Sequence, residues 1–154
     1  MKGKNFYILL AVVAVGILIL IGAGRFLTPG GGVYWKDTAI RCLITGHQNI
    51  TLHIHPHLRI VVNGADEDIP ASVGVSPACM AEVHTHDATG TLHVESSEAD
   101  KSFTLQDFFD VWGSPLMREG YSLDMTVDGE NSDALGTLVL RDGQNIILTY
   151  TPER

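Results

Sequence analysis

Cysteine is rare in this chain, and basic residues are few relative to acidic ones. Only two of its 154 residues are cysteines, Cys42 and Cys79, and they do not form a Cys-x-x-Cys motif. A structural disulfide in an oxidising compartment is therefore the expected state, with a pair of thiolate ligands or a redox couple as the alternative. Ten basic residues against 18 acidic ones give a formal net charge of −8. We therefore do not expect nucleic acid as a partner.

Several catalytic and cofactor-binding motifs are also missing. The chain has no glycine-rich phosphate-binding motif, no Gly-x-Ser-x-Gly nucleophile motif and no His-Glu-x-x-His zinc motif. The pair His84 and His86 does not follow the cupin pattern, because Gly90 and Thr91 stand where that pattern places a glutamate or a substitute ligand. No internal repeat or low-complexity tract is present. These absences leave no familiar enzyme signature.

The longest apolar run predicts a membrane anchor. Residues 6–23 carry no charge, and these 18 residues would span about 27 Å as a helix, which fits one membrane crossing. Lys2 and Lys4 precede the run and only Arg25 follows it closely, so the positive-inside rule predicts a cytoplasmic N-terminus. The prediction is a single-pass protein of the cytoplasmic membrane, with its remaining chain outside. A cleaved signal peptide is the alternative.

The chain beyond the anchor is long enough for one domain and too short for two. From residue 26 onward it carries 18 acidic and seven basic residues, a net charge of −11. Such a surface favours the approach of cations and repels anionic lipid head groups. The predicted division is a membrane anchor at 1–25, a flexible glycine-rich spacer at 26–36 and an extracytoplasmic domain at 37–154.

Strand patterns dominate the predicted domain, whose fold class is α+β with about six or seven mostly antiparallel strands and one short helix. Helical spacing of aromatic residues, a Thr104 N-cap and Gly113 predict the helix. The predicted strands are an alternating segment at 52–62 that is at an edge or bulged at Pro56, a segment after the turn at 63–64, a hairpin formed by 81–87 and 91–95, a strand at 121–127 and a terminal hairpin formed by 137–140 and 145–150.

Histidines gather in three clusters within this domain. They are His53, His55 and His57; His84 and His86, followed by Asp87; and His93, followed by Glu95. On a strand, an i, i+2 spacing places both side chains on one face, about 6.5 to 7 Å apart, so that two imidazoles can converge on one ion. Imidazole and carboxylate groups suit zinc and copper.

Strand register decides whether the clusters meet. If the loop between 81–87 and 91–95 has an even number of residues, His84 faces His93 and Glu82 faces Glu95, and three histidines share one patch with a carboxylate. A change of one residue sends His93 to the opposite face. We predict that His84, His86 and His93 form the core of a metal site, with Asp87 or Glu95 as a further ligand or as a group that orients a ligand. The first cluster either completes this site or builds a second one, and the isolated His47 is expected to be structural.

A resemblance follows from these motifs. The strings His-x-His-x-His-Leu, His-Thr-His-Asp-x-Thr-Gly-x-Leu-His-Val-Glu-Ser and Phe-Thr-Leu-x-x-Phe-Phe-x-x-Trp-Gly resemble a family of small prokaryotic proteins with one N-terminal membrane segment and an extracytoplasmic domain. The resemblance covers roughly residues 42 to 113 and implies this topology, but no particular activity. It also implies that the following residues belong to one pattern: Cys42, His53, His55, His57, Cys79, His84, His86, Asp87, His93 and Glu95.

Three function classes agree with the sequence. The first is a membrane-anchored metal-binding protein that buffers or delivers copper or zinc, with copper favoured because its intrinsic affinity for such ligands is higher. The second is an accessory subunit of a larger membrane complex, in which the histidines are structural. The third is a metal-dependent hydrolase or oxidase, which would need an open coordination position and a general base such as Glu82 or Glu95.

Overall fold

The computed structural model describes residues 32–44 and 46–154. The apolar run at 6–23 lies outside these residues, as does most of the predicted spacer. Within the described ranges, no helix has both the length and the apolar character needed to span a membrane. The residues from Val33 onward form one unit, which is mostly β structure with one short helix, in agreement with that part of the predicted fold class.

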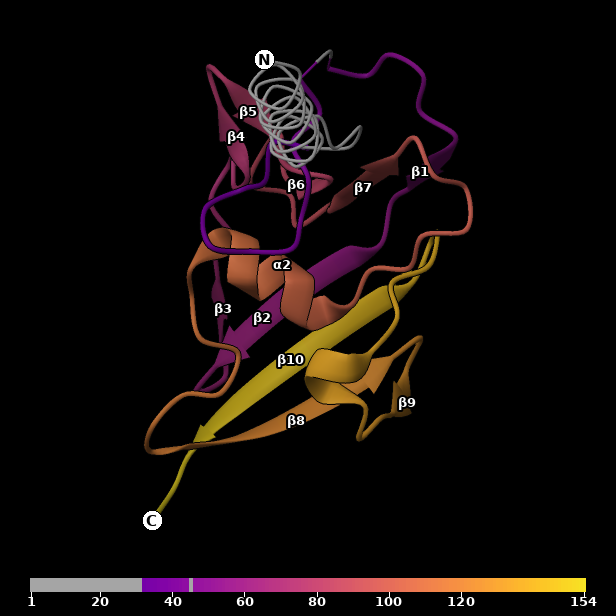
Figure 1. Ribbon diagram of the computed structural model, residues 1–154. Helices are drawn as coiled ribbons and strands as arrows, with labels where there is room; N and C mark the ends of the chain where they lie inside the picture. The colour runs from indigo at the N-terminus through magenta and orange to yellow at the C-terminus, as the bar shows by residue number, and fades with distance from the viewer. Residues whose placement is uncertain (1–31, 45) are drawn as a thin grey trace, which may run out of the picture. The chain divides into compact units, whose positions relative to one another are not determined.

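The larger sheet has five strands and forms one layer of the domain (Figure 1). In spatial order these strands are β3 (Ala65–Glu67), β2 (His57–Val62), β10 (Asn145–Pro152), β8 (Tyr121–Val127) and β9 (Glu130–Asn131). The neighbouring strands β2 and β10 are parallel, and the other pairs are antiparallel. Leu58 and Ile60 alternate with exposed residues in β2, so one face of the sheet is apolar.

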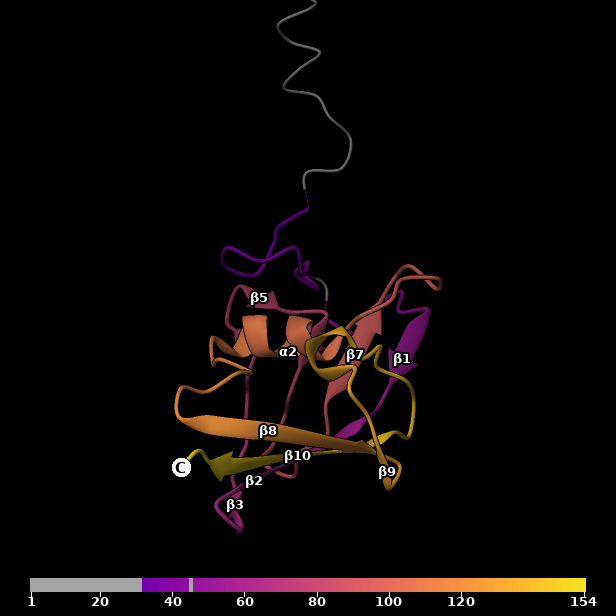
Figure 2. The same cartoon turned by 90° about the horizontal axis from the view of Figure 1, so that it is seen from below.

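Helix α2 (Leu105–Trp112) covers this apolar face, as Figures 1 and 2 show. The Thr104 hydroxyl accepts from the Asp107 N–H, and the Asp107 carboxylate accepts from the Thr104 N–H, which is a complete capping box. Gly113 ends the helix in the left-handed conformation, with φ 74°. Phe108 and Phe109 point into the core and are almost fully buried. The predicted helix is therefore confirmed together with its start and its end.

A second, smaller sheet carries the histidines. Its order is β1 (Leu52–Ile54), β7 (His93–Ser96) and β6 (Val83–His84), with both pairs antiparallel. Beside it, β4 (Val75–Ser76) and β5 (Cys79–Met80) form a short hairpin. Cys79 forms a disulfide with Cys42, whose Cα lies 5.1 Å away, so the predicted bridge is confirmed. This bridge ties the N-terminal segment of the domain to the hairpin.

Two strand predictions are corrected by the structure. Residues 137–140 do not pair with β10: the 3₁₀ helix η1 (Leu135–Thr137) occupies part of this segment, and the Leu140 N–H donates to the Phe103 carbonyl instead. The buried Leu140 packs in the core, so this segment lies against the start of helix α2 and adds no strand to the sheet. The predicted strand at 52–62 also divides at Pro56, and its two halves join different sheets as β1 and β2.

The strand count is higher than expected. The described residues contain ten strands, of which β4, β5, β6 and β9 have only two residues each. The predicted turn at 63–64 is present, because Asn63 and Gly64 both have positive φ, 55° and 83°, and connect β2 to β3.

At the start of the domain, the Trp35 indole N–H donates to the Val111 carbonyl at 3.0 Å. Trp35 falls within the predicted spacer, and it is hydrogen bonded to the domain.

Candidate metal centre

Four candidate residues lie on one face of the three-stranded sheet. In the central strand β7, His93 and Glu95 are two positions apart and therefore point to the same side. His84 of β6 pairs with His93, and His53 of β1 pairs with Glu95. The even-loop register predicted for the hairpin is thereby confirmed. The opposite face carries Val94 and other apolar side chains of the core.

The first histidine group is formed by His84, His86 and His93, whose candidate ligand atoms all lie within 4.8 Å of one another. The Nε2 atoms of His84 and His86 are 3.2 Å apart and face each other. Two ligand nitrogens of a tetrahedral ion with bonds of about 2.0 to 2.1 Å stand roughly 3.3 Å apart. This pair therefore already has the spacing that one shared metal ion requires.

Burial and one hydrogen bond set the chemical state of His84. Its side chain is fully buried, and its Nδ1 lies 2.9 Å from the Ala81 carbonyl oxygen. A carbonyl only accepts, so Nδ1 carries the proton and Nε2 presents its lone pair when the ring is neutral. Burial lowers the pKa of His84 to about 4, which keeps the ring neutral at pH 7. His84 thus offers the neutral nitrogen that metal coordination needs.

The backbone around His84 and His86 is held firmly by the intervening residue. The Thr85 hydroxyl donates to the Pro70 carbonyl at 2.9 Å and accepts from the Val73 N–H at 3.0 Å. Gly74 packs against the same segment with φ +75°, and a Cβ there would come within 2.8 Å of the Val83 carbonyl oxygen. Buried packing therefore fixes the backbone on which the two histidines stand.

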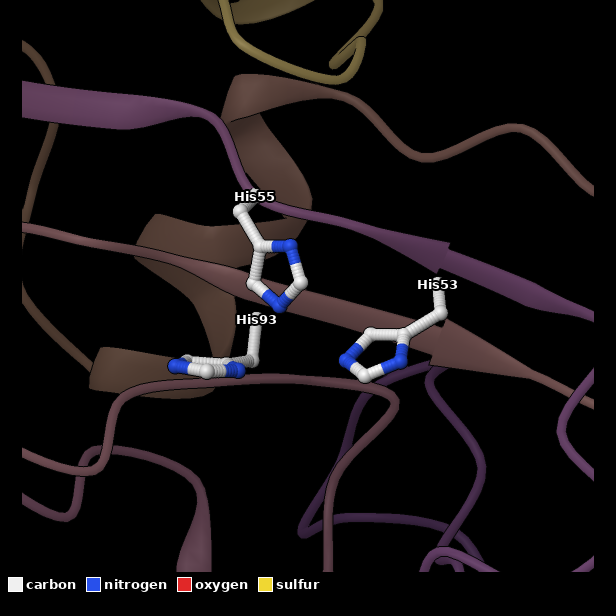
Figure 3. A group of neighbouring side chains, drawn as sticks. All are labelled: His53, His55 and His93. Atoms are coloured by element: carbon white, nitrogen blue, oxygen red, sulfur yellow. The ribbon is translucent and has the colours of Figure 1, made fainter.

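The second histidine group is formed by His53, His55 and His93, again with candidate ligand atoms within 4.8 Å of one another. Figure 3 shows the rings of His53 and His55 turned toward the ring of His93. The side chains of His53 and His55 are 49% and 42% exposed, so both rings have room to adjust. The His55 backbone N–H donates to Asp142 Oδ1 at 2.8 Å, which holds the chain just beyond β1 in place.

Glu95 is a fully buried carboxylate between these rings. Its oxygens lie 2.8 Å from His47 Nδ1 and 3.0 Å from His53 Nε2. His47 was expected to be structural, and it belongs to neither histidine group, although its ring centroid is 5.7 Å from that of His86. Sequence reasoning missed the contact between His47 and Glu95, because these residues stand 48 positions apart. No signal in a single sequence could have found it.

The remaining candidates lie at the margin or outside both groups. His57 Nε2 lies 2.9 Å from the Thr89 carbonyl oxygen, and His57 belongs to neither histidine group. The Asp87 carboxylate accepts from the Thr89 hydroxyl and N–H, and these bonds lower the pKa of Asp87. Glu82 is buried, and its carboxylate forms an ion pair with the Lys101 ammonium at 2.5 Å. Asp87 shapes the loop beside the first group, whereas Glu82 is part of a separate ion pair.

The donor set limits which ions fit. Both cysteines are in the disulfide, so thiolate ligands are excluded. Neutral imidazoles with carboxylates nearby form a nitrogen and oxygen ligand set, which zinc, copper and nickel accept more readily than calcium or magnesium. The two histidine groups could hold a metal ion.

Comparison with known proteins assigns the chain to no family. No protein-family model, curated protein or solved structure matches the chain. The resemblance to single-pass prokaryotic proteins therefore stays a prediction, and the histidine groups carry the functional argument alone.

Proposed function

We propose that the protein is a membrane-anchored, extracytoplasmic copper-binding protein that buffers or delivers the ion. The observation that carries the proposal is the pair of Nε2 atoms of His84 and His86, 3.2 Å apart with the His93 ring beside them. Because His84 is neutral with its proton on Nδ1, its Nε2 lone pair points at the second imidazole. One metal ion bound by both nitrogens would take the place of the hydrogen bond that joins them in the metal-free protein.

Copper(II) is the proposed ion because of the ligand types. Divalent copper binds nitrogen ligands more tightly than the other first-row ions, including zinc. The acidic domain further lowers the cost of holding a cation. Zinc remains the competitor, since three imidazoles and a water also complete a tetrahedral zinc site.

Unequal burial of the ligands agrees with storage and transfer of the ion. His84 is fully buried and fixed, whereas His86 is exposed, as are His53 and His55 to almost half their side-chain area. An incoming ligand can therefore replace the exposed imidazoles one at a time while His84 stays coordinated to the ion.

The membrane location rests on the apolar run at 6–23 and on the disulfide. A bridge such as Cys42–Cys79 persists in oxidising compartments and is rare in the cytosol. Both features agree with an anchored domain outside the cytoplasm.

A metal titration of the full-length protein in detergent tests the proposal. Metal-free protein should bind copper(II) more tightly than zinc in competition with a chelator of known affinity. The double variant His84→Ala, His86→Ala should lose tight binding and keep its disulfide and circular dichroism spectrum. His57→Ala is the matched control, because this histidine lies outside both groups, and it should bind as the wild type does. A wild-type protein that binds neither ion, or a double variant with unchanged affinity, would refute the proposal.

A further inference from the structure

His93 belongs to both histidine groups. It lies in the central strand β7, with His84 on the neighbouring strand β6 and His53 on the neighbouring strand β1. Its ring centroid is 4.5 Å from that of His86 and 4.8 Å from that of His55. The position of His93 in the middle of the sheet thus places one imidazole between two pairs of imidazoles.

The two ring nitrogens of His93 point in different directions. In Figure 3, His53 and His55 both approach one end of this ring, and the other ring nitrogen points away from them. His84 and His57 each have a ring nitrogen hydrogen bonded to a backbone carbonyl, and His47 has one hydrogen bonded to Glu95. His53 Nε2 lies 3.0 Å from a Glu95 oxygen. His93 makes no such bond within the described part of the chain. Both of its nitrogens are thus available to ligands.

We propose that the centre is dinuclear, with the His93 imidazole as a bridge between two copper(II) ions. One ion is held by His84, His86 and one nitrogen of His93, and the other by His53, His55 and the second nitrogen. This inference rests on the proposed function, because it extends the same site. With two metal–nitrogen bonds of about 2.0 Å and the width of the ring between them, the ions stand roughly 6 Å apart.

The chemistry of the bridge balances without a redox change. A neutral imidazole has one lone pair and one N–H group. Binding of the second ion breaks the N–H bond of His93, the proton leaves to a water or buffer base, and the freed electron pair forms the second metal–nitrogen bond. The bridge is then an imidazolate, whose negative charge lies between the two cations and offsets their repulsion.

Carboxylates flank both ion positions and contribute further negative charge. Glu95 is buried next to His53, and Asp142 Oδ1 is 3.8 Å from His55 Nδ1. Asp87 interacts electrostatically with both His86 and His93. Three carboxylates and one imidazolate equal the four positive charges of two copper(II) ions. A single ion with a neutral His93 would leave a net charge of −1 on the same groups.

Copper stoichiometry and electron paramagnetic resonance of the full-length protein in detergent test the bridge. Metal-free protein is loaded with one and then two equivalents of copper(II) sulfate. We expect two tightly bound ions per chain, and the spectral intensity per copper at low temperature should fall sharply with the second equivalent, because an imidazolate couples the two unpaired spins. These measurements on the wild type do not depend on any variant folding.

Matched variants assign the two positions. His53→Ala, His55→Ala changes two exposed residues and should bind one copper per chain with a full, uncoupled signal. His93→Ala should lose the coupling and weaken both positions, and His57→Ala should leave two coupled ions.

The outcomes separate the two proposals. One ion per chain in the wild type, or two ions with uncoupled spins, would refute the bridge and leave the copper-binding proposal standing. No copper bound at all would refute both.

Discussion

Acidification should destabilise the metal-free domain through His84. In the unfolded chain this histidine takes up a proton as the pH falls through about 6.5, its ordinary pKa. In the folded domain burial lowers the pKa of His84 to about 4, so the ring stays neutral until the solution is much more acidic. Between these two values the unfolded state binds more protons than the folded state. Stability therefore falls as the pH falls.

The size of the effect follows from the difference between the two pKa values. One pKa unit corresponds to about 1.4 kcal/mol, so the loss between pH 7 and pH 4 is about 3 kcal/mol for this single residue. The contribution has its full value above pH 6.5 and is lost progressively down to the folded-state pKa. A loss of this size is a large part of the total stability of a small domain.

Denaturant unfolding at several pH values measures the effect. Guanidinium unfolding of full-length, metal-free protein in detergent can be followed by the fluorescence of Trp35 and Trp112, with the disulfide intact. The variant His84→Asn keeps a polar group that can bond to the Ala81 carbonyl but does not titrate. Its stability should depend less steeply on pH than that of the wild type. Identical pH slopes for the two proteins would refute the assignment of the low pKa to His84.

Three further predictions concern the fold and its location. Replacing Cys42 and Cys79 by alanine should reduce the free energy of unfolding by about 4 kcal/mol, since the bridge closes a separation of 37 positions, and guanidinium unfolding measures it. Gly90→Ala should cost about 2 kcal/mol or more in the same assay, because φ is +85° and the Cβ would lie 2.3 Å from the Leu58 carbonyl oxygen. Gly64→Ala is its control: φ is +83° with nothing within 4 Å, so its smaller loss, about 1 kcal/mol, isolates backbone strain from the clash. A protease added outside intact, wall-stripped cells should cut the domain, and full protection would contradict the proposed orientation.

Local sequence patterns predicted much of what surrounds the centre. The helix could be predicted because Thr104, Asp107 and Gly113 specify its ends through neighbouring residues. The pairing of His84 with His93 could be predicted because alternation along two adjacent segments leaves few registers. In both cases the deciding interactions lie within about ten positions of the sequence.

Long-range contacts account for the parts that could not be predicted. The parallel pairing of β2 with β10 depends on apolar faces that several strands share, so the alternation at 145–150 alone does not select its partner. The contact of His47 with Glu95 joins a lone loop residue to a buried strand. The central position of β7 likewise comes from sheet order, which places β1 on one side of His93 and β6 on the other.

The hydrogen bond between His55 and Asp142 has a consequence for the order in which the centre is assembled during synthesis. It joins residues 87 positions apart, whereas His84, His86 and His93 lie within one hairpin. Closing a short loop costs less entropy and is faster than bringing distant segments together. The first group can therefore form on an incomplete chain, but His55 is anchored only after Asp142 has been synthesised. A newly made protein should accept its first ion before its second.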